Sequence, residues 1–329
     1  MGGKARPELL KGLVFEHLGA KPYRLILGPS IGEDAAAIDF GEEKLVLHTD
    51  PITGARELAG WLAIHVPCND VAATGADPLW VSVALLIPSS GGEKCLESVV
   101  RSLDEAARSI GVAIVSGHTE FVDYIESPIL VSTCMGLAKR IVATSGARPG
   151  DVVIVTKSVA LEGTAILATD FEEELLKRGV SRDLIASARE FYKRVSVVEE
   201  ARVLRDFATS MHDPTEGGIV GGLLEVAAAS RARIVVYEDR IPISRETEAI
   251  CSAMGVDPLR LISSGCLIAT VPRALADKAI DMLRRRGIEA AIIGEVAEGM
   301  GVEIVKKSGE RVYITEWVED ELYRLLSSR

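Results

Sequence analysis

Four aspartates occupy positions from which carboxylates could bind a metal ion. Asp34 follows a loop rich in glycine and proline, and Asp50 ends an apolar stretch. Asp70 lies inside an otherwise apolar helical pattern, and Asp213 precedes a glycine-rich segment. Carboxylate oxygens are the ligands that Mg²⁺ prefers, and Mg²⁺ in proteins is commonly bound together with phosphates. These aspartates therefore indicate a site for Mg²⁺ and a phosphorylated ligand.

Asp70 is the aspartate whose position is hardest to explain structurally. It follows Asn69 in the apolar run 62–73, where an unpaired buried charge would be costly, so a ligand or a buried ion pair is required. Asp34 and Asp50 could equally be loop or capping residues. Asn69 is the single asparagine of a chain that has no glutamine. We interpret this as a specific role for Asn69, and the shortage of amides as typical of a protein from a hot environment.

Two further polar segments follow predicted strands. Gly117, His118 and Thr119 come directly after a strand predicted at 112–116 and could contact a phosphate or a base, although an ordinary polar loop is an equal alternative. Glu162 opens a predicted helix and offers a carboxylate for proton transfer. An acidic residue in the first turn also stabilises any helix, which is the simpler interpretation of Glu162.

The segment after Asp213 combines a polar start with several glycines. Thr215 is expected to cap a helix over 215–230, with Glu216 in its first turn. Glycines from Gly217 onward lower helix propensity, which favours a close approach of the backbone to a ligand or to another chain.

Strands and helices alternate along the chain and must position these residues. Apolar patterns predict strands at 46–50, 79–87, 112–116 and 129–137, and helices at 58–74 and 93–110. Beyond a turn at 147–151, they predict strands at 151–156, 233–237, 266–271 and 289–294, helices within 181–207 and at 215–230, 244–254 and 274–286, and a hairpin joining 302–305 to 312–315. We expect two α/β (α+β) domains, 1–148 and 149–329, with helices on one face of a mixed sheet in the first.

Composition excludes several classes of protein. The 329 residues carry a formal net charge of −11, which argues against a general nucleic-acid binder. No apolar run is long enough to cross a bilayer, and the five scattered cysteines fit a reducing cytoplasm. The sequence contains no GxxxxGK[S/T] or HExxH motif. A phosphorylated ligand must therefore be held by other means, such as metal ions and backbone amides.

Five segments, in order and spacing, resemble the AIR synthase-like (PurM-like) ATP-binding superfamily over nearly the whole chain. Within that superfamily the sequence is most similar to the hydrogenase-maturation HypE family and its archaeal relatives. The segments are Gly32–Ala36, His48–Asp50, Asn69–Pro78, Gly117–Glu120 and His212–Gly218.

The resemblance implies a PurM-like two-domain fold whose N-terminal sheet forms a barrel with a second subunit, so that the protein is a homodimer. It implies ATP and Mg²⁺ as cofactors, with Mg²⁺ on Asp34, Asp50 and Asp70. It also implies contact with ATP from seven further residues besides Asp70, and a catalytic role for Asp213, to which Glu162 is added as a carboxylate suited to proton transfer. The seven are Asn69, Gly117, His118, Thr119, Thr215, Glu216 and Gly217.

The chemistry implied is phosphorylation of an amide-like oxygen by ATP, which in HypE-like members dehydrates a carbamoyl group on a C-terminal cysteine. This sequence ends in Tyr323–Arg329, and its last cysteine is Cys266, so carbamoylation at the tail is not expected. A small-molecule kinase resembling thiamine-monophosphate kinase and an inactive nucleotide-binding scaffold are the alternatives. The resemblance implies a cytoplasmic protein with a hydrogenase-maturation or carbamoyl-transfer partner, and no role in nucleic acid or membrane binding.

Overall fold

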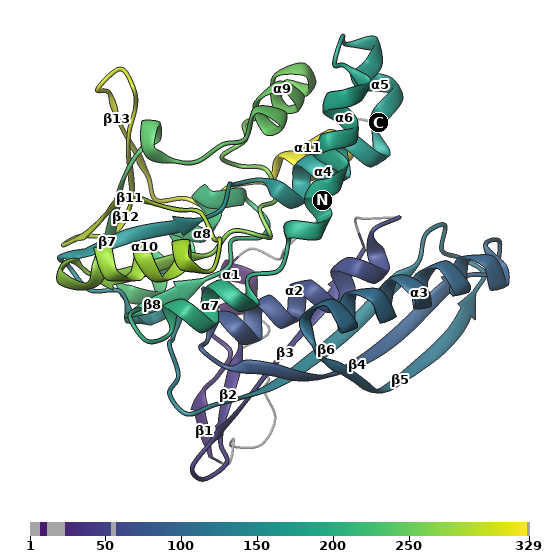
Figure 1. Cartoon of the computed structure of the whole chain (residues 1–329), viewed down its shortest axis with the longest axis horizontal. Helices are drawn as coiled ribbons and strands as arrows, with labels where there is room; N and C mark the ends of the chain where they lie inside the picture. Colours follow the sequence, from purple (N-terminus) through teal and green to yellow (C-terminus); the bar gives the residue numbers. More distant parts are fainter. Residues whose placement is uncertain (1–6, 12–23, 54–56, 328–329) are drawn as a thin grey trace.

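The computed structural model describes residues 7–11, 24–53 and 57–327. Two mixed sheets dominate it, one built from each half of the sequence (Figure 1). A short helix, α1 (Pro7–Leu9), precedes the first sheet. Among the described helices, none has both the length and the apolarity that a membrane crossing requires.

The N-terminal sheet has six strands in the order β1-β2-β3-β6-β4-β5. Only β4 and β5 pair in parallel, and every other neighbouring pair is antiparallel. The strands are β1 (Leu25–Leu27), β2 (Ala36–Asp39), β3 (Lys44–Ile52), β4 (Asp77–Pro88), β5 (Ala113–Val122) and β6 (Ile129–Ala138).

Helices cover one face of this sheet and leave the other face open. The helices α2 (Ala59–Ala73) and α3 (Gly92–Ile110) lie side by side over β3, β6 and β4 (Figure 1). Alternate residues along β6 are fully buried beneath them, whereas the intervening ones, such as Val131 and Met135, stay partly exposed on the open face. The expectation that helices lie on one face of a mixed sheet is therefore confirmed.

The C-terminal sheet has seven strands in the order β13-β12-β9-β11-β7-β10-β8 and is covered by helices on both faces. Every residue of β7 is buried, as expected of a central strand between two layers. The strands are β7 (Asp151–Thr156), β8 (Ser210–His212), β9 (Arg233–Tyr237), β10 (Ile268–Pro272), β11 (Ala290–Ala297), β12 (Gly301–Val305) and β13 (Arg311–Ile314).

The largest difference from the predicted helices of this half lies within 181–207. The long helix expected within 181–207 is divided into α6 (Arg182–Arg189), a 3₁₀ segment (Glu190–Arg194) and α7 (Val198–Leu204). Main-chain groups at 195 and 197 turn instead toward the other domain, where they bond to Asn69. The remaining α-helices are α4 (Leu161–Asp170), α5 (Glu172–Lys177), α8 (Gly218–Ser230), α9 (Arg245–Met254), α10 (Ala276–Arg285) and α11 (Glu321–Ser327).

Polar contacts join the two halves along α2. The Asn69 amide, completely buried, donates to Val195 O at 2.8 Å and accepts from Val197 N at 2.9 Å. The indole N–H of Trp61 donates to Tyr192 O at 2.7 Å. Because these bonds end on main-chain atoms of the second half, they fix the position of α2 relative to that half.

A candidate ATP and metal site between the two domains

A pocket of about 380 Å³ lies between the two halves of the chain. Among the described residues that line it there is no lysine or arginine, so its charge is strongly negative. Its titratable lining consists of His48, His212, Tyr323 and eight carboxylates: Glu33, Asp34, Asp50, Asp70, Glu162, Asp213, Glu216 and Glu225.

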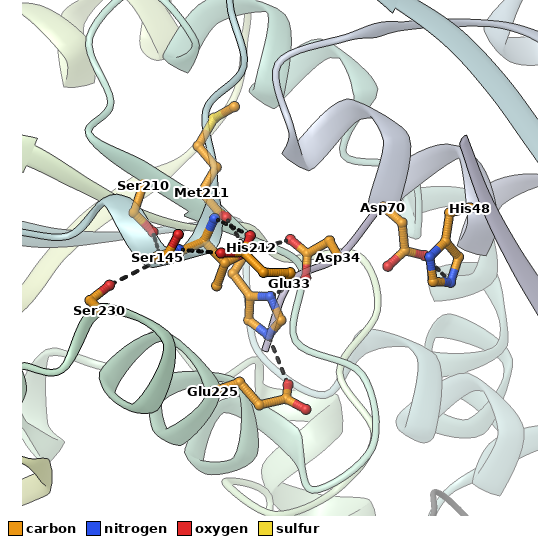
Figure 2. A network of polar contacts seen from close by, with 11 residues as sticks. Glu33, Asp34, His48, Asp70, Ser145, Ser210, Met211, His212, Glu225 and Ser230 are labelled. Carbon is orange, nitrogen blue, oxygen red and sulfur yellow. Dashed lines mark hydrogen bonds and ion pairs between the residues drawn. The ribbon is translucent and has the colours of Figure 1, made fainter. Parts of the chain in front are cut away.

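His212 connects Asp34 of the first domain to Glu225 of the second. Its Nδ1 contacts Asp34 Oδ1, and its Nε2 lies 2.9 Å from Glu225 Oε2, with all three side chains buried (Figure 2). Burial opposes a charge on the imidazole, but the two carboxylates outweigh it and hold the pKa of His212 well above its usual range. A protonated His212 therefore offsets part of the negative charge around Asp34.

The backbone before Asp34 passes unusually close to α8. Gly32 adopts a φ of +82°, and a Cβ at this position would lie 2.6 Å from the carbonyl oxygen of Glu225. Glycine is thus required there for both conformation and space. Glu33 accepts the backbone N–H groups of Thr144 and Ser145 at 3.1 and 3.2 Å. These contacts hold Asp34 at the entrance to the pocket.

Asp50 and Asp70 both approach the same ring nitrogen of His48. Asp50 lies within β3, which continues to Ile52, and its Oδ1 is 3.1 Å from His48 Nε2. Asp70 lies in α2, with its Oδ2 3.8 Å from the same nitrogen (Figure 2). Burial lowers the basicity of His48, but Asp70 and Asp50 together raise its pKa to about 10. Burial itself raises the pKa of Asp70 well above its usual range.

The carboxylates form two groups that share Asp70. His48, Asp50 and Asp70 make one group, and Asp34, Asp70 and Asp213 make the other. Within each group the ligand atoms lie within 4.8 Å of one another. Both oxygens of buried Asp213, and Oδ2 of Asp70, have no hydrogen-bond partner in the described part of the chain. Mg²⁺ prefers hard oxygen ligands, so these buried oxygens are suited to bind it.

A second end of the pocket contains Glu162, at the start of α4, and Ser264. Both are buried, and Glu162 Oε2 and the Ser264 hydroxyl each lack a hydrogen-bond partner among the described residues. Burial raises the pKa of Glu162 to about 7. Asp320, just before α11, is buried nearby and accepts the backbone N–H groups of Gly217 and Leu322 at 2.7 and 2.8 Å.

Two of the residues predicted to contact ATP do not line the pocket. Asn69 does not line the pocket, because both atoms of its amide bond the backbone of the other domain. Gly217 donates its N–H to Asp320, so this amide is already engaged. Thr215 and Glu216 do line the pocket, but Thr215 is not a helix cap: α8 begins at Gly218 and is preceded by Gly217 in a left-handed conformation.

Gly117, His118 and Thr119 lie within β5 rather than in a loop after it, so that part of the prediction is wrong. They are exposed at the edge of the N-terminal sheet and do not line the pocket of their own chain. The register pairs His118 with Ala84 and Ala84 with Val131, which places His118 on the open face. Contact of these residues with ATP stays a prediction.

The sequence alone predicts no role for four residues of the site: His48, His212, Glu225 and Ser264. Each histidine comes one or two positions before an aspartate of the site, and this spacing was an available signal. Glu225 gave no such signal, because an acidic residue in a helix is usually a solvated one. Its burial depends on the approach of the Gly32 loop, which only the folded chain shows.

Comparison with known proteins agrees with this geometry. Models of the AIR synthase related protein family match residues 32–138 with the N-terminal domain and 148–307 with the C-terminal domain. The hydrogenase expression/formation protein MJ0676 of Methanocaldococcus jannaschii is 31% identical over 94% of this chain and 93% of its own length. Carbamoyl dehydratase HypE of Rhizobium leguminosarum is 28% identical, with 97% and 91% covered. Thiamine-monophosphate kinase of Pyrococcus horikoshii is 29% identical, with 88% and 90% covered.

Solved structures show the same fold. A HypE–HypF complex superposes with a TM-score of 0.75 at 24% identity, covering 93% of this chain and 98% of the other. The hydrogenase maturation protein HypE in complex with ATP superposes with a TM-score of 0.73 at 26% identity, covering 98% and 97%. The chain therefore belongs to the AIR synthase related family and is close to the hydrogenase-maturation proteins within it.

Proposed function

We propose that this protein is an ATP- and Mg²⁺-dependent enzyme that activates an amide-like oxygen by phosphorylation, as in the carbamoyl dehydration of hydrogenase maturation. One observation carries the proposal: two groups of metal-ligating side chains share Asp70 inside a pocket without lysine or arginine among its described lining residues. A triphosphate in such a pocket needs cations to offset the carboxylates. Relatives named carbamoyl dehydratase HypE, and a HypE structure that contains ATP, support this choice.

Asp34, Asp50, Asp70 and Asp213 are the residues that would hold Mg²⁺. The ion, when bound, would neutralise phosphate charge and stabilise the phosphoryl group during transfer. His212 holds Asp34 in position and offsets part of the local negative charge before the ligand arrives. The buried contacts of His212 with Asp34 and Glu225 fix this part of the site before ATP binds.

The proposed reaction begins with transfer of the γ-phosphoryl group from ATP to the oxygen of a carbamoyl or related amide group, with ADP as the leaving group. Cleavage of the resulting C–O bond releases phosphate, and loss of the two N–H protons gives a nitrile-type carbon–nitrogen triple bond. Asp213 and Glu162 are the proposed catalytic carboxylates. A pKa of about 7 allows Glu162 to accept or release a proton near neutral pH.

We also propose that two chains associate through the open face of the N-terminal sheet. Trp80 is 38% exposed there, and Val131 and Met135 lie on the same face. Exposed apolar side chains gathered on one face of a sheet are typical of a protein interface. Because one similar structure is a HypE–HypF complex, a hydrogenase-maturation or carbamoyl-transfer protein is the proposed partner.

Calorimetric titration with a non-hydrolysable ATP analogue, with and without Mg²⁺, tests the site. We expect binding that depends on Mg²⁺ in the wild type and a loss of at least about tenfold in affinity, or about 1.4 kcal/mol, in Asp70→Asn. The exposed variant Asp206→Asn serves as the control, with unchanged binding expected. Absence of Mg²⁺-dependent binding in the wild type would contradict the proposal.

A small-molecule kinase is the second candidate, favoured by the similarity to thiamine-monophosphate kinase. Product analysis separates the two reactions. A kinase leaves the phosphoryl group on its product, whereas a dehydratase releases inorganic phosphate together with a nitrile-type product. ATP binding without either product would favour a nucleotide-binding scaffold.

A further inference from the structure

One end of the pocket contains buried polar atoms that the proposed metal site does not use. Glu162 is 5% exposed and Ser264 is 1% exposed, and both line the pocket. Glu162 Oε2 and Ser264 Oγ make no hydrogen bond of good geometry in the described residues, although Ser264 lies near enough to Glu162 to lower its pKa. A buried polar group without a partner is destabilising, so such groups usually serve a ligand or an ordered water. A ligand that donates N–H groups would satisfy both oxygens.

The charges around these two atoms favour a cation. Glu216 and Tyr323 both line the pocket, and burial, followed by the charges of Glu216 and Glu162, raises the pKa of the Tyr323 phenol. Asp320 lies close enough to Glu162 and Glu216 for their charges to raise its own pKa, alongside the effect of burial. The lining residues that the structure describes include no lysine or arginine to balance them. With a neutral ligand, this negative charge would be relieved only by proton uptake on the carboxylates.

A nitrogen cation fits this end better than a metal ion. In the described residues, the groups of three ligand atoms within 4.8 Å involve Asp34, His48, Asp50, Asp70 and Asp213, and none includes Glu162, Glu216 or Asp320. The pocket lining also includes the apolar and aromatic side chains Ile166, Ile262, Trp317, Leu322 and Tyr323. Aromatic faces attract organic cations, and aliphatic side chains pack against the carbon atoms that carry the charge.

We propose that this end of the pocket, the Glu162 subsite, binds a positively charged nitrogen group of the substrate, either a primary ammonium or an amidinium. Glu162 and Ser264 accept its N–H groups, and Glu216 adds a second negative charge. The inference rests on the proposed function, because ATP and Mg²⁺ are assigned to the other end of the same pocket. It adds a substrate class: an amide-like acceptor that also carries a cation.

Benzamidine and benzamide are suitable probes, because they have nearly the same shape and differ in charge. Their affinities are measured by ligand-observed NMR for the full chain with Mg²⁺ and a non-hydrolysable ATP analogue present. We expect the wild type to bind benzamidine at least tenfold more tightly than benzamide. In Glu162→Gln the preference should fall to less than threefold, and in Ser264→Ala benzamidine affinity should fall at least threefold.

Glu303→Gln is the matched control, since Glu303 is equally buried but lies in β12, paired with arginines outside the pocket. It should keep the wild-type preference. Equal affinity of the wild type for the two probes, no binding of either, or an unchanged preference in folded Glu162→Gln would overturn the subsite. Binding of the ATP analogue is measured in the same samples. Its absence, with the benzamidine preference retained, would overturn the proposed function and leave the subsite standing.

Discussion

Replacing Asp213 by asparagine should stabilise the metal-free protein and weaken its response to Mg²⁺. Asp213 is 2% exposed, and neither of its carboxylate oxygens has a hydrogen-bond partner in the described structure. Burial, and then the charges of Asp70 and Asp34, raise its pKa well above the usual range. The charged Asp213 carboxylate thus destabilises the native state unless a cation binds to it.

The size of the effect follows from the spacing of the carboxylates. Ligand atoms of Asp34, Asp70 and Asp213 lie within 4.8 Å of one another. Two unit charges at this separation repel by about 3.5 kcal/mol at an effective dielectric constant of about 20. Proton uptake and the positive charge of His212 relieve part of this repulsion. We therefore expect the free energy of unfolding of Asp213→Asn, without divalent ions, to exceed that of the wild type by about 1 to 3 kcal/mol.

The assay is urea denaturation in EDTA, repeated with Mg²⁺ and a non-hydrolysable ATP analogue. A ligand at a hundredfold excess over its Kd stabilises the wild type by about 2.7 kcal/mol, and the variant should gain much less. Asp77→Asn is the control, because Asp77 bonds Arg202 and Arg205, both at 2.8 Å. Asp77 is partly exposed, so its replacement should destabilise by no more than about 1 kcal/mol in either buffer.

A loss of stability in Asp213→Asn without Mg²⁺ would refute this reasoning. It would mean that the Asp213 carboxylate is satisfied within the native protein and that repulsion among the three aspartates is small. An equal ligand response in variant and wild type would separately remove Asp213 from the binding site.

Three further outcomes are expected. Asn69→Ala should lower the free energy of unfolding by about 2 to 4 kcal/mol in urea denaturation, because two buried backbone groups lose their partner; a change below 1 kcal/mol would contradict the bridging role. His48, with its pKa raised to about 10, contributes stability that is fully present below its ordinary pKa and is lost as pH rises toward 10. The free energy of unfolding in EDTA should therefore fall over that pH range in the wild type and more weakly in His48→Asn. Equal slopes against pH in the two proteins would show that His48 is not the source of this pH dependence. Met135→Lys on the open sheet face should yield monomers by light scattering, and an unchanged mass would remove that face as the dimer interface.

Local patterns were enough to predict most of the fold. Strands such as β7 and β9, and α9 with its serine cap, agree closely with prediction, because their apolar spacing and end residues agree with their tertiary setting. The helix expected at 181–207 fails because its 194–198 segment bonds Asn69, a contact made across more than a hundred residues. Tertiary contacts of this kind leave no periodic signal in the sequence.

The sequence identifies the aspartates of the candidate site, but it does not show the contacts that arrange them. Aspartates next to glycines or inside apolar runs are conspicuous, and Asp34, Asp50, Asp70 and Asp213 do line one pocket. The sequence does not show that His212 links Asp34 to Glu225, which lies thirteen residues after His212 in the chain. Asn69 shows the opposite case. As the single asparagine of the chain it was expected to have a specific role, but the sequence does not show that its amide bonds the backbone of the second domain.

The amide of Asn69 also determines how the pocket can open. It bonds the second domain one residue before Asp70, while Asp34 is tied to the same domain through His212. A hinge motion that separated the domains would break both connections and disperse the carboxylates. These connections therefore oppose a hinge motion and favour ligand exchange without separation of the two domains.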